Sequence, residues 1–140
     1  MHGFQSCCGE NTERVMTEEQ LLHGNITRCI IGAAMEVHGQ LGPGFLESVY
    51  EEALAYEFEL QGISFERQRS IDVAYKGKSV KQFVCDYLVE GRVVVELKAI
   101  KTITNIEKCQ LIYYLKATRL RVGLLLNFGA QSLEYKRLMN

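Results

Sequence analysis

The sequence at residues 83–98 reads FVCDYLVEGRVVVELK, which indicates two apolar β-strands joined by a tight turn. Each strand carries a charge where an apolar side chain is expected: Asp86 in the first, and Glu96 with Lys98 in the second. Residues two apart on a strand project from the same face, so Glu96 and Lys98 lie side by side. An isolated pair of this kind is most simply a structural ion pair. The nearby Asp86 favours a functional site, because buried charges need partners or a metal ion.

The turn decides whether Asp86 joins this pair. A two-residue loop would point Asp86 away from Glu96. We expect a three-residue loop over residues 89–91, with Gly91 in the left-handed conformation and a G1 bulge. That register sets Asp86 opposite Val94 and diagonal to Glu96, on one face of the sheet.

Asp86, Glu96 and the backbone carbonyl of Leu97 would form a site of hard oxygen ligands. Such ligands suit Mg²⁺ or Mn²⁺, which keep bound waters and accept phosphate oxygens. Lys98 could orient or deprotonate a water and stabilise charge that develops on a phosphate. The pattern therefore predicts metal-assisted hydrolysis of phosphodiester bonds.

Around this hairpin, the chain alternates between helical and strand periodicity. Helices are expected at residues 25–39, with Asn25 as N-cap, and at 45–60, with Gly62 beyond the end. Strands are expected up to residue 75 and at residues 79–88, 92–99, 122–128 and 133–138. A capping box at residues 104–107 opens a further helix that runs to about residue 118. The predicted fold is α/β, with a three-stranded meander plus one or two further strands in a mixed central sheet flanked by helices, in the order α-α-β-β-β-α-β-(β).

Composition is typical of one globular domain. The chain has 140 residues, of which 47% are hydrophobic, and we expect a flexible arm at residues 1–16 followed by one domain at 17–140. No signal-peptide pattern or membrane-spanning apolar run is present, so the expected location is cytoplasmic, without membrane contact. Residues 1–63 carry 2 basic and 10 acidic side chains, whereas residues 64–140 carry 14 basic and 7 acidic. This asymmetry is compatible with a nucleic-acid partner.

Asp86 followed by Glu96-Leu97-Lys98 on the next strand resembles the PD-(D/E)XK nuclease core. The segment GFLESVY at residues 44–50 is similar to the signature of the GxxExxY protein family within that superfamily. The likeness extends from about residue 21 to residue 136. It implies a restriction-endonuclease-like core and a role for Glu47 as a metal ligand or as the residue that orients Lys98; otherwise Glu47 is a solvated helix glutamate.

The helix after the third strand carries Gln110 and Tyr114, four residues apart and on one helix face. This Q-x-x-x-Y spacing is similar to a motif of the exonuclease-like branch of the superfamily, where it helps shape the active site. Gln110 is the expected functional residue of the two. Tyr114 is equally well explained as a packing residue.

The favoured function is a nuclease that uses Mg²⁺ or Mn²⁺ and acts on nucleic acid, with DNA favoured over RNA. Its expected catalytic residues are Glu47, Asp86, Glu96, Lys98 and Gln110, and its expected metal ligands are Asp86, Glu96 and Leu97. The alternative is a non-catalytic nucleic-acid- or protein-binding module that keeps the nuclease fold. A homo-oligomer that uses its acidic helices as an interface also remains open.

Overall fold

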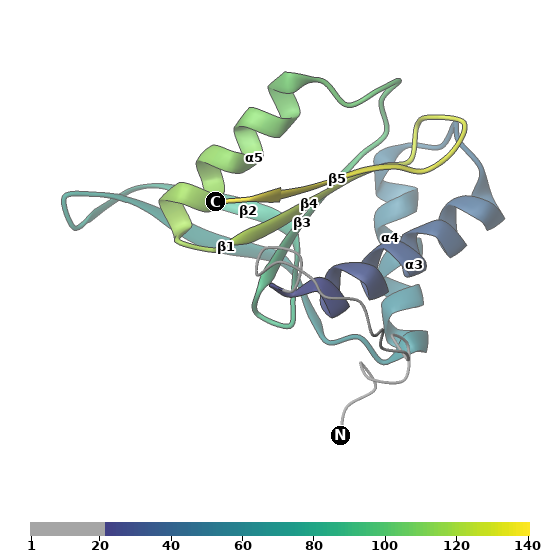
Figure 1. Cartoon of the computed structure of the whole chain (residues 1–140), viewed down its shortest axis with the longest axis horizontal. Helices are drawn as coiled ribbons and strands as arrows, with labels where there is room; N and C mark the ends of the chain where they lie inside the picture. Colours follow the sequence, from purple (N-terminus) through teal and green to yellow (C-terminus); the bar gives the residue numbers. More distant parts are fainter. Residues whose placement is uncertain (1–21) are drawn as a thin grey trace.

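Residues 22–140 fold as two helices, three strands, a helix and two further strands (Figure 1). The structure is a computed structural model that describes residues 22–140, so the arm expected at residues 1–16 lies outside the described residues. In chain order the elements are α3 (Gly24–Leu41), α4 (Glu47–Gln61), β1 (Phe65–Tyr75), β2 (Lys78–Val89), β3 (Val93–Lys98), α5 (Asn105–Thr118), β4 (Val122–Asn127) and β5 (Glu134–Met139). The predicted order is confirmed, with the final strand present. Within residues 22–140, no helix is long and apolar enough to cross a membrane.

The five strands of the described part form one mixed sheet in the order β1-β2-β3-β4-β5. The pairs β1–β2, β2–β3 and β4–β5 are antiparallel, whereas β3 and β4 are parallel. Parallel neighbours need a crossover connection, and α5 supplies it between β3 and β4. The predicted three-stranded meander within a mixed sheet is therefore confirmed.

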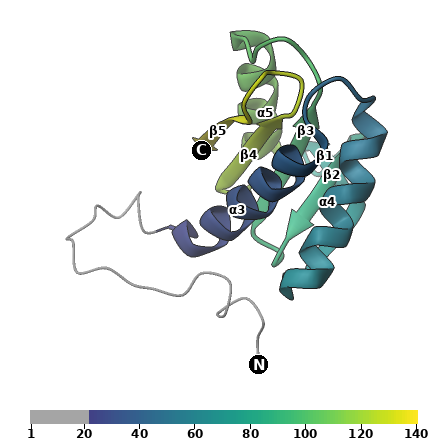
Figure 2. The same ribbon diagram turned by 90° about the vertical axis from the view of Figure 1, so that its right-hand side faces the viewer.

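Helices cover both faces of the sheet (Figure 2): α3 and α4 lie on one face and α5 on the other. In β3, Val95 and Leu97 belong to the core cluster under α3 and α4, whereas Val94 belongs to the cluster under α5. Because side chains alternate along a strand, Glu96 and Lys98 project toward the α5 face.

The expected helix ends are mostly correct. Thr104 and Glu107 form the predicted capping box at the start of α5, and Gly62 ends α4 in the left-handed conformation with φ 74°. The expected N-cap at Asn25 was wrong. The first helical hydrogen bond of α3 closes on the carbonyl of His23, which lies in the left-handed region, so Asn25 falls inside the helix.

The β2–β3 turn has a different register from the one expected. Val89 pairs with Val93, so the three-residue loop is 90–92 and the expected loop over 89–91 was wrong. Gly91 does adopt the left-handed conformation, with φ 67°. The physical reason is burial: Val89 is 0% exposed in the core under α3 and α4, and a loop starting there would take it off the strand.

Candidate active site

Asp86 lies where the β2–β3 ladder ends. The pair next to it is Tyr87 with Val95, and one further step in the same register sets Asp86 opposite Glu96. The expectation that Asp86 lies opposite Val94 was therefore wrong, as a consequence of the corrected turn. The ladder no longer pairs these two residues, but the Asp86 carboxylate lies near enough to that of Glu96 for its charge to raise the pKa of Glu96.

The carboxylate of Asp86 is held by the backbone of the neighbouring strand: its Oδ2 atom accepts a hydrogen bond from the N–H of Leu97 at 2.8 Å. Residues two apart on a regular strand share a face, but Tyr87 packs under α4 while Cys85 packs under α5. Strand β2 therefore reverses its faces between these two residues. On β1, the residue level with Asp86 is Gln68, which has a left-handed φ of 49°. Both strands thus change the face they present at the level of Asp86.

Glu96 is a buried carboxylate whose hydrogen bonding is incomplete. Among the described residues, its Oε2 atom is buried and has no hydrogen-bond partner. Burial and then the charge of Asp86 raise the pKa of Glu96 to about 8, while Lys98 acts to lower it. Burial also raises the pKa of Asp86, against the hydrogen bond from Leu97. Two neighbouring acids with raised pKa values form a site that favours a proton or a cation.

Glu47, in the first turn of α4, belongs to the same electrostatic group. Partial burial raises the pKa of its carboxyl, Asp86 raises it further, and Lys98 lowers it. The α4 side of the sheet therefore contributes Glu47, and β2 and β3 contribute Asp86, Glu96 and Lys98.

Glu51, one turn after Glu47, is a residue that the sequence analysis missed. Its carboxylate accepts a hydrogen bond from Gln68 at 2.8 Å and pairs with Arg67 at 3.3 Å, and its charge raises the pKa of Asp86. Nothing local distinguishes Glu51 from the other α4 glutamates. Glu51, Gln68 and Asp86 come together only because β1 and β2 change the face they present at the level of Asp86.

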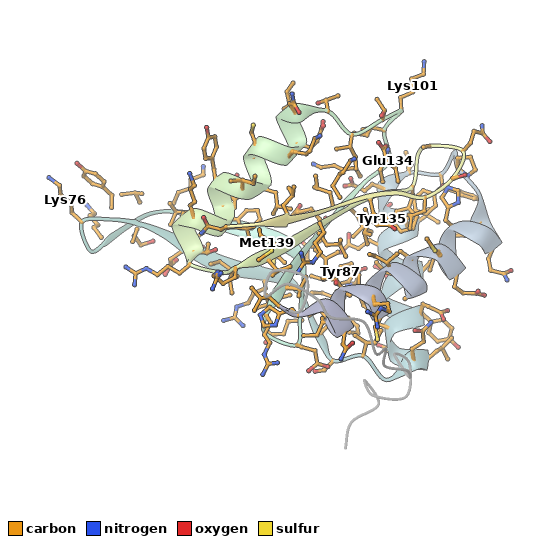
Figure 3. The ribbon with its side chains drawn as sticks, viewed as in Figure 1. Lys76, Tyr87, Lys101, Glu134, Tyr135 and Met139 are labelled. Carbon is orange, nitrogen blue, oxygen red and sulfur yellow. The ribbon has the colours of Figure 1, made fainter. Side chains whose placement is uncertain are left out.

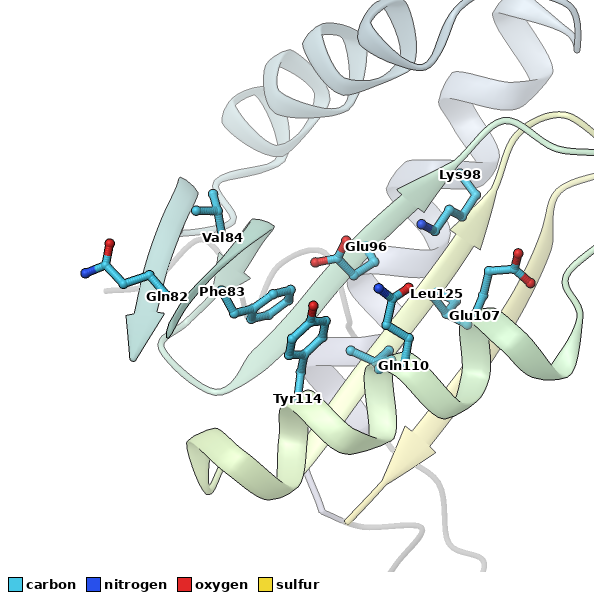
Figure 4. Close-up of a pocket in the computed structure, with 10 residues that line it drawn as sticks. Gln82, Phe83, Val84, Glu96, Lys98, Glu107, Gln110, Tyr114 and Leu125 are labelled. Atoms are coloured by element: carbon cyan, nitrogen blue, oxygen red, sulfur yellow. The ribbon is translucent and has the colours of Figure 1, made fainter. Parts of the chain in front are cut away.

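A pocket of about 280 Å³ opens between α5 and the sheet (Figure 4). Three of the predicted residues line it: Glu96, Lys98 and Gln110. Figure 4 shows Gln110 pointing from α5 toward Glu96. The other lining residues are Gln82, Phe83, Val84, Glu107, Leu111, Tyr114 and Leu125. Asp86, Leu97 and Glu47 are not among the lining residues, so the structure brings only part of the predicted set to the pocket wall.

Tyr114 both packs and lines the pocket. Its ring stacks on Phe83 with centroids 3.7 Å apart and an interplanar angle of 14°. The two interpretations of Tyr114 are thus compatible, because one face of the ring packs while the residue remains part of the wall.

The segment that follows Lys98 is held by a buried polar network, which the sequence analysis also missed. Asn127 Oδ1 accepts hydrogen bonds from the N–H groups of Ile100 at 2.9 Å and Gly129 at 3.0 Å. Its Nδ2 atom donates to Glu134 at 2.9 Å. Figure 3 labels Glu134, the first residue of β5. A Cβ atom on Gly129 would lie 2.4 Å from the Ile100 carbonyl oxygen, so the two backbones are in close contact.

Tyr50, the last residue of the 44–50 segment, supports the loop before Glu47. Its hydroxyl donates to the Gly42 carbonyl at 2.5 Å and accepts from the Phe45 N–H at 3.2 Å. Its ring stacks on Phe128 with centroids 4.7 Å apart. The segment is therefore anchored at Tyr50 to Phe128, the residue that follows β4, and Glu47 lies one turn of α4 before this anchor.

The donor chemistry fits a hard divalent cation only in part. In residues 22–140, no three carboxylate, imidazole or thiol side chains gather into a metal-binding group. The candidate ligands are instead two carboxylates, Asp86 and Glu96, and the Leu97 carbonyl. The buried Glu96 oxygen without a hydrogen-bond partner is the observation that fits a cation at this position.

A family model described as the PD-(D/E)XK nuclease superfamily matches residues 24–138. The matched range contains all the residues of the candidate site, from Glu47 to Gln110. The comparison with curated proteins gives no match.

Proposed function

Because this chain belongs to the PD-(D/E)XK nuclease superfamily, we propose that it is a divalent-metal-dependent nuclease that hydrolyses phosphodiester bonds in nucleic acid, with DNA as the preferred substrate. The observation that carries the proposal is the closeness of Asp86 to Glu96, whose Oε2 atom is buried without a hydrogen-bond partner in the described part of the chain. Family membership supports the reaction class, and the site geometry supports the residues. Within the superfamily we further propose the GxxExxY family, on the segment that runs from Gly44 to Tyr50.

Asp86, Glu96 and the Leu97 carbonyl would hold Mg²⁺ or Mn²⁺. The bound ion would supply Lewis acidity toward a phosphate oxygen and make water more acidic. In the protein itself, the Leu97 N–H fixes the orientation of the Asp86 carboxylate. Burial and the charge of Asp86 raise the pKa of Glu96, and a cation held between the two carboxylates would offset their mutual repulsion.

Lys98 is the proposed catalytic cation. It shares the pocket face of β3 with Glu96, where its ammonium can orient the attacking water and offset the negative charge that develops on the phosphate. Hydrolysis adds the water oxygen to phosphorus and breaks one P–O ester bond. The charges of Asp86 and Lys98 both shift the pKa of Glu47, so the three side chains lie near one another. We therefore assign to Glu47 the role of orienting Lys98.

Gln110 completes the proposed set from the opposite wall of the pocket. Its side chain points from α5 toward Glu96 and lines the pocket. The Gln110 amide could there donate a hydrogen bond to a phosphate or sugar oxygen of the substrate. It is thus a substrate-positioning residue.

A non-catalytic nucleic-acid-binding module is the second candidate. The observation that favours it is the lack of three converging metal-binding side chains within residues 22–140. The two candidates differ in their need for metal and for Lys98, because a binding module tolerates the loss of both.

The test is cleavage of single-stranded DNA, double-stranded DNA and RNA in Mg²⁺, Mn²⁺ or EDTA. Cleavage that requires metal and is lost in Lys98→Ala but kept in Lys136→Ala, an exposed lysine on β5, supports the nuclease. A folded protein that cleaves none of the three substrates in either metal contradicts the nuclease and leaves the binding module.

A further inference from the structure

The hairpin of β1 and β2 extends well beyond the rest of the sheet (Figure 1). Figure 3 places Lys76 at its tip, far from the helices. Residues 78–82 of β2 are exposed, and so is Tyr75, with 63% of its surface accessible. A two-stranded hairpin with little core of its own gains little stability from its own packing, so the length of this arm calls for another explanation.

A β-bulge brings two lysines of the arm onto one face. Val73 pairs with Lys81 and Tyr75 pairs with Lys78, which leaves Val80 without a partner on β1. Residues opposite each other share a face, and Val73 and Tyr75 are two apart on β1, so Lys81 and Lys78 project from the same side.

This face continues directly into the pocket. Two residues before Val73, Ile71 pairs with Phe83, and Phe83 lines the pocket and stacks on Tyr114. Phe83, Lys81 and Lys78 therefore follow one another outward along one side of the arm, from the pocket wall toward the tip. We call this series the arm track.

The arm track is cationic and its charges are unpaired. In the described part of the chain, the salt bridges do not involve Lys76, Lys78 or Lys81. The acid of the outer arm, Asp72, lies opposite Gln82 and accepts its hydrogen bond at 3.2 Å, on the other face of the hairpin. Among residues 22–140, no carboxylate forms an ion pair with Lys78 or Lys81.

We propose that the arm track binds the phosphate backbone of the nucleic-acid strand that enters the pocket. The proposal rests on the proposed function, since it names how the substrate of that site is held. Lysines bind phosphates as point charges and release condensed counterions. The exposed ring of Tyr75, over which the Lys76 ammonium lies 5.4 Å from the centroid, offers an aromatic surface beside that charge on which a base can stack. The arm thus extends the contact with substrate beyond the pocket, where Lys98 and Gln110 act.

The experiment is equilibrium binding of a fluorescent 20-nucleotide single-stranded DNA, its duplex and the matching RNA to the full chain in EDTA, over a series of salt concentrations. The test variant is Lys78→Gln with Lys81→Gln. The control is Arg28→Gln with Arg92→Gln, which removes two exposed charges from α3 and from the β2–β3 turn. A charge-conserving variant, Lys78→Arg with Lys81→Arg, separates charge from side-chain shape.

The expected result is weaker binding in the test variant alone, with the slope of log K against log salt reduced by roughly 0.7–0.9 for each lost phosphate contact. The charge-conserving variant should bind like the wild type. The nucleic acid whose binding shows this change identifies the substrate type that the arm holds. An equal loss in the control, no loss in the test variant, or no salt-dependent binding of any of the three by the wild type overturns the proposal.

Cleavage measured on the same proteins separates this inference from the proposed function. Metal-dependent cleavage with unchanged binding in the test variant rejects the arm track and keeps the nuclease. Loss of binding in the test variant without cleavage by the wild type keeps the arm track and rejects the nuclease.

Discussion

The Asp86 carboxylate accepts the backbone N–H of Leu97 at 2.8 Å, across the point where β2 and β3 stop pairing. This side-chain contact replaces a hydrogen bond that the ladder no longer makes. Leu97 thus has two roles: its N–H orients the Asp86 carboxylate, which is one candidate metal ligand, and its carbonyl is another candidate ligand. The Asp86–Leu97 contact is therefore the structural basis of the candidate site.

Asp86→Asn should abolish activity while preserving the fold. The amide keeps an oxygen that accepts the Leu97 N–H, but it removes the negative charge that a cation needs. We expect kcat/KM to fall at least about 100-fold, a loss typical of removing one group that stabilises the transition state. The measurement is metal-dependent cleavage beside thermal unfolding. Asp72→Asn, on the exposed arm, is the matched control, and comparable activity in the two variants would count against Asp86 as a ligand.

Lys98→Ala should lower kcat and leave substrate binding nearly unchanged. Its ammonium acts on charge that develops in the transition state, so a ground-state complex loses little. We expect a decrease in kcat on the order of 100-fold or more. Single-turnover cleavage, together with binding measured in EDTA, separates the two effects. If Lys98→Ala bound substrate poorly but cleaved it at the normal rate at saturating substrate, Lys98 would be a binding residue.

Metal-free protein should lose stability as pH rises. The folded-state pKa of Glu96 is raised from 4.5 to about 8, so folding favours its protonated form. The stabilisation is fully present below pH 4.5 and is lost as pH rises through 8. Each unit of pKa difference is worth about 1.4 kcal/mol, so the loss can reach a few kcal/mol.

The corresponding measurement is thermal unfolding at pH 5 and pH 8, in EDTA and in Mg²⁺. Glu96→Gln, which cannot ionise, should flatten the pH dependence in EDTA. Mg²⁺ should restore stability to the wild type at pH 8, because it binds the ionised carboxylates. A wild-type protein whose stability in EDTA is the same at both pH values would show that Glu96 titrates normally.

Tyr50→Phe should destabilise the loop before Glu47. The hydroxyl of Tyr50 bonds to both Gly42 and Phe45, and its removal deletes two partly buried hydrogen bonds to the backbone. We expect a loss of roughly 1–3 kcal/mol in the free energy of unfolding by urea. Tyr56→Phe, on the exposed side of α4, is the control and should be nearly neutral. Equal stability of the two variants would mean that the loop does not depend on the Tyr50 hydroxyl.

Gly129→Ala should disturb the segment after Lys98. The added Cβ would meet the Ile100 carbonyl oxygen at 2.4 Å, which is backbone and cannot move aside cheaply. We expect lower stability and lower activity together. Gly39→Ala in α3 is the control: its Cβ would meet nothing within 4 Å, and a helical alanine should stabilise by roughly 0.5–1 kcal/mol. Normal activity in Gly129→Ala would show that this segment does not support the site.

Much of the fold could be predicted because its signals are local. The Thr104–Glu107 capping box and the left-handed Gly62 and Gly91 depend on a few neighbouring residues, and the structure has all three. Period-two alternation likewise indicated that Glu96 and Lys98 share a face. The roles assigned to these two residues stay predictions until activity is measured.

The sequence by itself determined the elements, their order and the shared face of Glu96 and Lys98 on β3, since these depend on backbone preferences and alternation within short windows. The tertiary structure alone decided three things: that Val89 stays in the core and so sets Asp86 opposite Glu96, that Glu51 meets Gln68, and that Asn127 holds the segment after Lys98. Each depends on residues well apart in the chain, whose burial and hydrogen bonding are settled only when the sheet and helices pack together.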